Sequence, residues 1–293
     1  MPLGASRLNT LSRVLTTPFS GLAGIQLDAD STQGEGHVFY QTNSFASTSD
    51  TDELTLAFWW KDTNNRTTYA HEDALFRFIN TGGNEYLQFN YFRGSTRLLA
   101  RSGSDSTFDL DIRHGVDGFS GGSYGNGTYD DGNWHHYLVS AKGSTSKFEL
   151  YVDGTEITQG SQNATQYLGA QKRFTENYWE GNHYNQFTLC AEVFDSGSGQ
   201  WPNQLTQLYL DNSFNDISDA STRAKFYNNG AVDMGTDGTG SGLDQPLVFH
   251  TGDTSSFFTN AGTGYAYSLT KVNKSSAGVD FTDIAAGDGP QPS

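Results

Sequence analysis

Hydrophobic and polar residues alternate in short runs along most of the chain, with the two-residue period of a β-strand. In the run ELTLAFWWK, residues 53–61, the side chains of Leu54, Leu56, Phe58 and Trp60 fall on one face of an extended strand. Runs with similar spacing occur at 86–92, 148–152, 187–193, 205–210 and 247–249. The pattern therefore predicts many short strands that each direct one face toward a core.

Glycine, asparagine, aspartate and serine cluster between these runs, as at 115–132 and 235–242, and predict loops. One segment departs from the strand pattern, because ISDASTRAKFYNNG, residues 217–230, has helical spacing. Ser218 is placed to cap the start of this helix, and Gly230 can end it in the left-handed conformation. Many strands, one short helix and no strand–helix alternation together predict an all-β fold, an antiparallel two-sheet sandwich.

Composition and charge narrow the function. The chain of 293 residues has 14% aromatic residues and 34 glycines, which suits a β protein with tight turns. Its formal charge of -16 argues against binding a nucleic-acid backbone. A single cysteine, Cys190, excludes an intrachain disulfide. Neither a signal-peptide core nor an apolar stretch long enough for membrane insertion is found, so we expect synthesis in a reducing cytoplasm.

The N-terminal segment differs from the rest, since the first acidic residue is Asp28 and Leu8, Leu11 and Leu15 recur at helical spacing. Three interpretations remain open for it: a flexible terminus, an arm that docks onto a partner protein, and an organellar transit peptide. The C-terminal end, AAGDGPQPS, is small and polar and is expected to fray. The predicted organisation is an arm at 1–20, a sandwich at 21–285 and a flexible tail at 286–293.

Residues 131–154, DGNWHHYLVSAKGSTSKFELYVDG, form a predicted hairpin that begins with two adjacent histidines. In an extended strand neighbours point to opposite faces. This sets Trp134, His136 and Leu138 on one face and His135, Tyr137 and Val139 on the other. The two imidazoles therefore cannot converge on one metal without a bulge. We interpret one as packed and the other as half-exposed, and the Asp-Gly pairs as turns.

The same hairpin resembles the one that marks laminin-G-like domains of the concanavalin A-like lectin/glucanase superfamily. The shared features are Asp-Gly-x-Trp-His-His, a spacer and Tyr-Val-Asp-Gly; segments 53–61 and 204–218 are similar to flanking strands of that family. Segment 221–264 resembles a tail in the form carried by tailed-bacteriophage and prophage structural proteins. The resemblance implies a jelly-roll sandwich, a place in the virion after synthesis in the host cytoplasm, and capsid or tail proteins as partners.

Candidate chemistry is sparse. Glycoside hydrolysis needs two carboxyl groups about 5 to 10 Å apart, and no strand carries carboxylates in the alternating pattern that would supply them. We therefore expect a non-enzymatic protein without a cofactor, with calcium as an open alternative. Laminin-G-like and pentraxin-like domains hold calcium through loop oxygens, and the candidate ligands are Asp28, Asp30, Asp130, Asp131 and Asp211. The competing interpretation is that these aspartates only form turns.

One segment has the composition of a glycan-binding site. ENYWEGNHYNQ, residues 176–186, sets Tyr178, Trp179, His183 and Tyr184 among polar residues that include Asn182. Aromatic faces stack on sugar C–H surfaces while amides bind hydroxyls, although such rings also pack loops onto a sandwich. We expect a virion protein, a capsid decoration or tail-associated, that adheres weakly to host-surface or environmental glycans. A free carbohydrate-binding module and then a glycan hydrolase are the alternatives, and a homo-oligomer is compatible with either.

Overall fold

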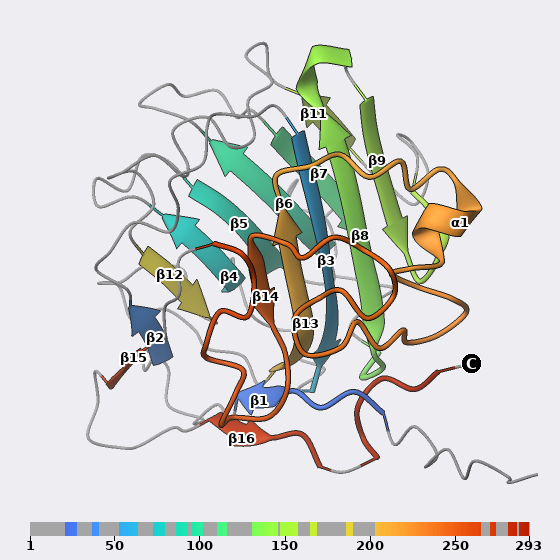
Figure 1. The fold of residues 1–293 in the computed structure, drawn as a ribbon. Helices are drawn as coiled ribbons and strands as arrows, with labels where there is room; N and C mark the ends of the chain where they lie inside the picture. The colour runs from blue at the N-terminus through green and yellow to red at the C-terminus, as the bar shows by residue number, and fades with distance from the viewer. Residues whose placement is uncertain are drawn as a thin grey trace, which may run out of the picture.

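The computed structural model describes the strands of a sandwich and the long segment that follows them (Figure 1). The described residues are 21–27, 37–40, 53–63, 73–79, 86–92, 95–101, 110–115, 131–145, 147–157, 165–168, 186–189, 203–264, 270–273, 281–285 and 287–292. Within these ranges nearly all regular structure is strand, and every pair of neighbouring strands is antiparallel. The predicted antiparallel two-sheet jelly-roll sandwich is confirmed.

An eight-stranded sheet forms one layer of the sandwich. Its order is β10 (Thr155–Glu156), β9 (Lys147–Val152), β8 (His135–Lys142), β3 (Glu53–Asp62), β13 (Asn203–Asp211), β1 (Ile25–Leu27) and β16 (Phe281–Asp283), with β14 (Val248–His250) also paired to β13. The 3-10 turn Gly143–Thr145 joins β8 to β9. Both edge strands of this order are short, which limits edge-to-edge association.

A six-stranded sheet forms the other layer. Its order is β11 (Thr165–Leu168), β7 (Leu110–Gly115), β6 (Ser95–Arg101), β5 (Tyr86–Phe92), β4 (Asp73–Ile79) and β12 (Gln186–Leu189). A two-stranded ribbon of β2 (His37–Tyr40) and β15 (Thr270–Asn273) lies beside β12. The edges of the six-stranded sheet are therefore β11 and β12, which follow one another in the sequence.

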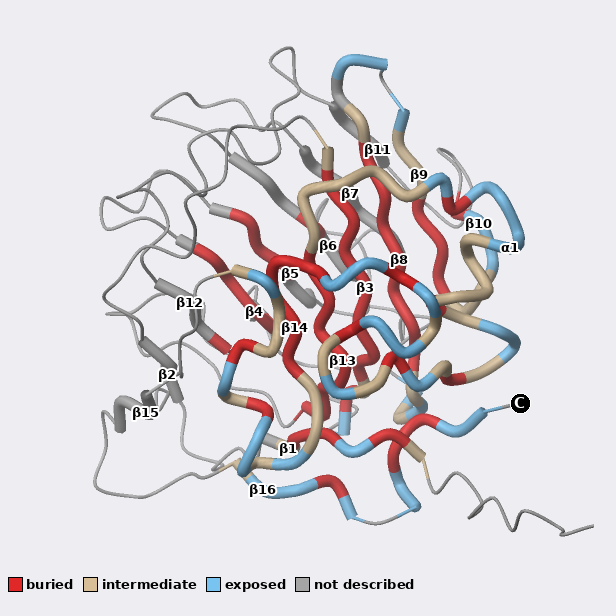
Figure 2. Tube along the Cα trace, in the orientation of Figure 1, coloured by how far each residue is buried: buried red, intermediate tan, exposed pale blue. Residues whose placement is uncertain are grey.

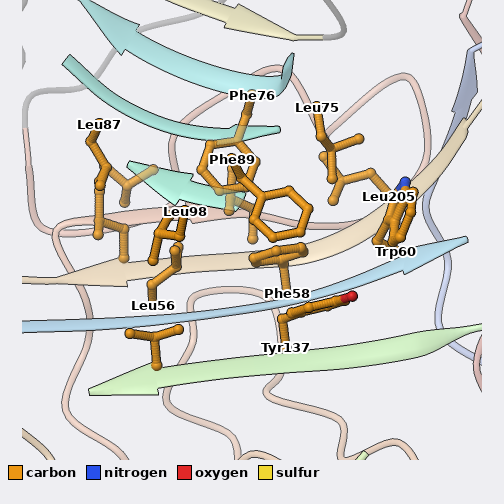
Figure 3. Close-up of a cluster of buried hydrophobic side chains, with 14 of the residues drawn as sticks. Leu56, Phe58, Trp60, Leu75, Phe76, Leu87, Phe89, Leu98, Tyr137 and Leu205 are labelled. Carbon is orange, nitrogen blue, oxygen red and sulfur yellow. The ribbon is translucent and has the colours of Figure 1, made fainter. Parts of the chain in front are cut away.

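The core between the sheets is built around aromatic rings (Figure 3). Phe58 of β3 stacks on Tyr137 of β8 at 5.4 Å between ring centroids, and it meets Phe76 and Phe89 of the facing sheet edge-on at 5.2 and 4.7 Å. Offset and edge-on contacts of this kind are the favoured arrangements of aromatic pairs. The predicted face of Leu54, Leu56, Phe58 and Trp60 is the face that lines this core.

The second face of the eight-stranded sheet is also buried, which the alternating pattern does not predict. Ala57, Leu138 and Tyr209 point away from the inter-sheet core and pack under the segment 212–264. That segment contributes Ile217, Phe226, Met234 and Leu243 to the same cluster, and Figures 1 and 2 show it crossing in front of β3, β8 and β13. Burial of both faces explains why β3 carries the unbroken run AFWW.

Hydrogen bonds tie this covering segment to the sheet beneath it. The backbone N–H of Asn215 donates to the hydroxyls of Thr55 and Ser140, each at 3.1 Å. Thr55 in turn donates to the carbonyl of Ser213 at 2.7 Å. Two buried hydroxyls in the middle of a sheet face are thereby paired, as buried polar groups must be.

Strand β13 changes partner in its middle. The edge of β13 that faces away from β3 pairs first with β1 near Leu205 and then with β14 near Leu208. The register of β13 against β3 shifts between Thr206 and Tyr209. Gln207 lies at this bulge with a φ of 48°, and neither polar atom of its buried side-chain amide has a hydrogen-bond partner. Both the left-handed conformation of a non-glycine residue and the unsatisfied amide lower the stability of the folded state.

The predicted helix is present but shorter, and its ends differ from the prediction. α1 covers Ala220–Arg223, and Asp219 rather than Ser218 caps it by accepting a hydrogen bond from the N–H of Ser221. The helix ends at Arg223, with Ala224 as a right-handed C-cap, so the predicted end at Gly230 is wrong. Asn229, with a φ of 52°, takes the left-handed conformation in the turn that follows.

Residues 287–292 are anchored, although their composition predicts a frayed tail. The carbonyl of Pro290 accepts a hydrogen bond from Leu22 N–H, and that of Gln291 accepts one from Ala231 N–H. The indole Nε1 of Trp134 donates to the carbonyl of Asp288 at 2.6 Å. Backbone carbonyls make all three bonds, so side-chain composition gave no signal of them.

Candidate functional site

The two adjacent histidines of β8 point to opposite faces of the sheet, as predicted. His136 pairs in register with Trp59 and shares the outer face with Leu138. Its ring lies 5.0 Å from that of Trp59 and stacks on Tyr227 at 5.5 Å. His135 pairs in register with Trp60 on the other face. The imidazoles therefore do not converge on one ion.

The prediction that one histidine is half-exposed is wrong, since His135 is 7% exposed and His136 is 1% exposed. The physical reason is a carboxylate on each side of the His135 ring. Its Nδ1 lies 2.6 Å from Asp153 Oδ2 and its Nε2 lies 3.1 Å from Asp131 Oδ1. Burial lowers the pKa of His135, but the hydrogen bonds and charges of the two aspartates outweigh this and raise the pKa above 6.5.

This Asp131–His135–Asp153 clasp closes the end of the hairpin. Asp153 also accepts a hydrogen bond from the backbone N–H of His136 at 2.8 Å. Asp153 and Gly154 have φ values of 50° and 73°, the pair of positive angles expected of an Asp-Gly hairpin turn. The Asp-Gly pair therefore forms the predicted turn, and the Asp153 carboxylate makes structural hydrogen bonds.

Neither histidine is arranged for catalysis. Both ring nitrogens of His135 are occupied by carboxylates, so the ring has no nitrogen left to accept a substrate proton. Burial lowers the pKa of His136 to about 3, against the opposing charge of Asp153, and keeps the ring neutral. It is also closed to solvent. The Trp-His-His motif therefore acts as a structural frame.

The described aspartates among the calcium candidates are engaged by protein groups. Asp131 accepts bonds from Asn133 and contacts His135, and Asp211 accepts one from the Ser213 hydroxyl. No group of three or more histidine, cysteine or acidic side chains is placed to hold a metal in the part of the chain that the structure describes. Asp28, Asp30 and Asp130 lie outside that part.

The outer face of the six-stranded sheet is a second candidate surface. Phe76, Phe78, Leu87, Phe89 and Leu98 line the inter-sheet core, so the residues between them in β4, β5 and β6 occupy outward positions. Registered pairing then gives one row of outward positions across the sheet, Thr188, Arg77, Gln88, Leu99, Asp111 and Tyr167. A neighbouring row holds Asn90, Arg97, Arg113 and Thr165.

Most of these outward positions are polar, with Leu99 as an exception, in contrast to those of the other sheet. Arg77 and Gln88, in the middle of the face, are 9% and 5% exposed. Tyr86 and Arg101 face each other in register at the next row. This face therefore brings together amide, guanidinium and phenol positions from strands that lie far apart in the sequence, which a single strand pattern does not reveal.

The predicted glycan-binding residues Tyr178, Trp179, Asn182, His183 and Tyr184 lie outside the described residues. In the sequence they fall between β11 and β12, the two edge strands of the six-stranded sheet. The predicted attachment residues Leu8, Leu11 and Leu15 lie outside the described residues as well. Both assignments stay predictions.

No helix in the described ranges has the length and apolar character needed to cross a membrane. The helix α1, with four residues, is far below that length.

No known protein family and no curated protein matches the sequence. Among solved structures, the chain is similar to a heptameric SAP-like pentraxin from Limulus polyphemus, with 12% identity, a TM-score of 0.43, and 86% of this chain and 95% of that chain covered. It is also similar to domains LG4-5 of the mouse laminin alpha1 chain, with 12% identity, a TM-score of 0.36 and 66% and 46% coverage.

A third similar structure is the receptor-binding domain of a botulinum neurotoxin of mosaic serotype C/D, with 11% identity and a TM-score of 0.38. The similarity covers 59% of this chain and 35% of that one. All three are concanavalin A-like jelly-roll folds. Similarities of this size carry no argument about function.

Proposed function

We propose that this chain is a non-catalytic glycan-binding sandwich displayed on a bacteriophage particle. The observation that carries the binding proposal is the outer face of the six-stranded sheet, where register places Tyr86, Asn90 and Tyr167 at outward positions. Phenol rings and amides are the groups that bind sugars, since the ring covers C–H surfaces and the amide orients hydroxyls.

The other sheet supports this choice of face. Its outer surface is filled by Ile217, Phe226 and Met234 of the chain itself, so a sugar chain would have to displace a hydrophobic cluster to reach it. Burying side chains of this kind stabilises the fold by about 1.5 to 3 kcal/mol each. On the six-stranded sheet the described outward residues Arg77 and Gln88 are polar and belong to no hydrophobic cluster, although both are buried.

Binding without hydrolysis is favoured by the acids on the proposed surface. Hydrolysis of a glycosidic bond needs a pair of carboxyl groups. On the described strands of the six-stranded sheet, Asp111 is the one acidic residue at an outward position. A single carboxylate can bind a hydroxyl but cannot serve as both acid and nucleophile.

The segment with Tyr178, Trp179, Asn182, His183 and Tyr184 is a further part of the proposal. It joins the two edges of the six-stranded sheet in the sequence, so its rings are suited to extend the same binding surface. The virion assignment rests on the resemblance of segment 221–264 to phage structural proteins. Residues 1–20 are proposed to attach the domain to the capsid or tail, and many copies on one particle would convert weak binding into avidity.

A glycan array probed with the full chain, presented in many copies and with or without calcium, tests the binding proposal. We expect selective binding that falls in a Tyr86→Ala variant and persists in Phe214→Ala, a matched ring removal beside the eight-stranded sheet. Absence of any signal would reject glycan binding. Release of reducing sugars from a bound glycan, lost on substitution of one acid, would reject the non-catalytic assignment.

The particle assignment has its own test. Mass spectrometry of purified phage particles should detect the chain, and deletion of residues 1–20 should abolish its incorporation while leaving the melting temperature nearly unchanged. Incorporation that is unaffected by the deletion would reject the attachment role of the arm.

A further inference from the structure

We infer that the turn 227–231, Leu22 and the C-terminal strap 287–292 form an acid-sensitive latch over the ring of His136. When the pH falls, this latch opens locally while the sandwich beneath it stays folded. The latch lies on the eight-stranded sheet, away from the proposed glycan-binding face.

The turn 227–231 seals His136 from solvent. Tyr227 stacks on the ring of His136 at 5.5 Å between centroids and lies 5.8 Å from the ring of Trp59. His136 is 1% exposed, and neither of its ring nitrogens has a hydrogen-bond partner; the indole nitrogen of Trp59 also lacks one. Buried polar groups without partners lower the stability of the state that buries them. The closed latch therefore leaves three nitrogens unpaired, and opening allows water to pair them.

This turn lies between two anchors of the covering segment. Phe226 and Met234, each 0% exposed, belong to the large hydrophobic cluster on the outer face of the sheet. Ala231 belongs to a small separate cluster that includes Leu22, and Tyr227 packs against that small cluster. A β-bridge between Tyr227 and Ala231 closes the turn on itself. The turn can therefore leave the sheet without displacing either anchor, as expected of a local unit that opens on its own.

The strap 287–292 connects the turn to the beginning of the described chain (Figure 1). Leu22 N–H donates to the carbonyl of Pro290 at 3.1 Å. Ala231 N–H donates to the carbonyl of Gln291 at 2.8 Å. Because one strap holds both partners, we expect the three parts to open together. Leu22 follows the segment that is proposed to attach the domain to a particle, so opening would also free the base of that arm.

Asp153 is the charged group that acts on the ring of His136. Its carboxylate accepts the backbone N–H of His136 at 2.8 Å, and its charge opposes the burial that lowers the pKa of the ring to about 3. Burial and the charge of Asp153 also raise the pKa of Tyr227, which keeps the phenol neutral. On β8 itself, His135 points to the other face. The titratable residues closest in sequence to the contacts on β3, β9, the covering segment and the strap are Lys61, Tyr151, Lys225, Asp233 and Asp288. None of these five contributes to the pKa shift of His136.

Opening restores the ordinary pKa of the His136 ring. A solvated histidine titrates near 6.5, so between pH 6.5 and about 3 the open form binds a proton that the closed form excludes. Closure is therefore fully favoured above pH 6.5 and is weakened as the pH falls. Between pH 7.5 and pH 5 the equilibrium constant for opening should rise about thirtyfold.

Amide hydrogen exchange of the full chain, followed by NMR, tests this latch. The N–H groups of Leu22 and Ala231 report on the latch because both donate to the strap, and the amides of β3 and β8 report on the sandwich. We expect the opening constants of the two latch amides, corrected for the intrinsic pH dependence of exchange, to rise about thirtyfold from pH 7.5 to pH 5. The amides of β3 and β8 should have opening constants roughly tenfold lower or less at both pH values.

Two variants remove the titrating group, and a third is the control. His136→Phe keeps a ring beneath Tyr227 but cannot take up a proton, so the rise at the latch amides should fall below about twofold. His136→Leu, with a smaller side chain that does not titrate, should behave in the same way. His250→Asn removes the other deeply buried histidine, keeps a donor for the carbonyl of Phe257 and should leave the rise at the latch intact. Thermal melting checks that each variant is folded.

Three results would overturn the latch. An equal rise in the wild type and in both His136 variants would show that this ring is not the trigger. Opening constants of the latch amides equal to those of β3 and β8 would show that only global unfolding exposes them. Latch amides whose opening constants do not change between pH 7.5 and pH 5 would show that the cover is insensitive to acid.

Discussion

Acid should destabilise this protein through buried histidines before its carboxylates titrate. His136 lies under Tyr227 and against Trp59, and neither of its ring nitrogens has a hydrogen-bond partner. Burial lowers its pKa to about 3. His250, in the core beside Phe257, has its pKa lowered to about 4 by burial, and the hydrogen bond that its Nδ1 donates to the backbone carbonyl of Phe257 opposes the shift.

The direction of the pH effect on the free energy of unfolding depends on whether the folded or the unfolded state binds the proton. An unfolded histidine titrates near 6.5, so between pH 6.5 and the folded value the unfolded chain holds a proton that the folded chain does not. Each residue's contribution is therefore fully present above pH 6.5 and is lost as the pH falls. Between pH 7.5 and pH 5 each of the two histidines should remove about 2 kcal/mol from the free energy of unfolding.

Substitution of His136 isolates the contribution of this one histidine to the pH dependence of stability. His136→Leu removes the titrating group together with two unpaired nitrogens, whose desolvation costs about 1 to 3 kcal/mol, so the variant should be close to wild type in stability at pH 7.5. Urea unfolding at pH 7.5 and pH 5 measures the difference directly. We expect the loss on acidification to be about 2 kcal/mol smaller in the variant.

Leu138→Ala is the matched control, because Leu138 is buried on the same face of the same strand. It should lower stability by about 2 to 5 kcal/mol at both pH values and leave the acid-dependent loss unchanged. An acid-dependent loss in His136→Leu equal to that of the wild type would refute the reasoning, since it would mean that the folded ring accepts the proton at its ordinary pKa.

Three further predictions concern the hairpin and the bulge. Asp153→Asn keeps a residue that tolerates the left-handed turn but removes a charge, so NMR titration should show a lower pKa for His135. The loss of stability in this variant should be larger at pH 6 than at pH 8. A pKa of His135 equal to that of the wild type would contradict the clasp. Gln207→Met should stabilise the protein by about 1 to 3 kcal/mol in urea unfolding, whereas destabilisation would reveal an unseen partner of the amide. Gly154→Ala should cost more than Gly132→Ala, because both have positive φ but only the first would place its new methyl 2.6 Å from a tyrosine ring; equal melting temperatures would contradict this.

The many alternating runs and the lack of strand–helix alternation predict the sandwich, and the alternation within the hairpin predicts the opposite faces of the two histidines. Local chemistry also identified the Asp153–Gly154 turn, since its requirement for positive φ is set by two residues. These features depend on neighbours in the sequence, and the sequence therefore contains the information needed to place them.

The features that were missed depend on distant segments. Ala57 and Trp59 gave no sign that segment 212–264 and the chain ends would cover their face, because small and aromatic residues occur on exposed faces too. The clasp joins Asp131 and Asp153 to one ring only after the hairpin has formed. The rows of outward positions across the six-stranded sheet require the register of neighbouring strands, which no single run of residues specifies.

A crystal structure of the full chain with its best-binding polysaccharide fragment tests the central claim most directly. The account predicts that the fragment lies across the outer face of the six-stranded sheet, with no pair of carboxyl groups flanking a glycosidic bond. A fragment seated against the eight-stranded sheet, or one held between two catalytic carboxyl groups, would contradict it.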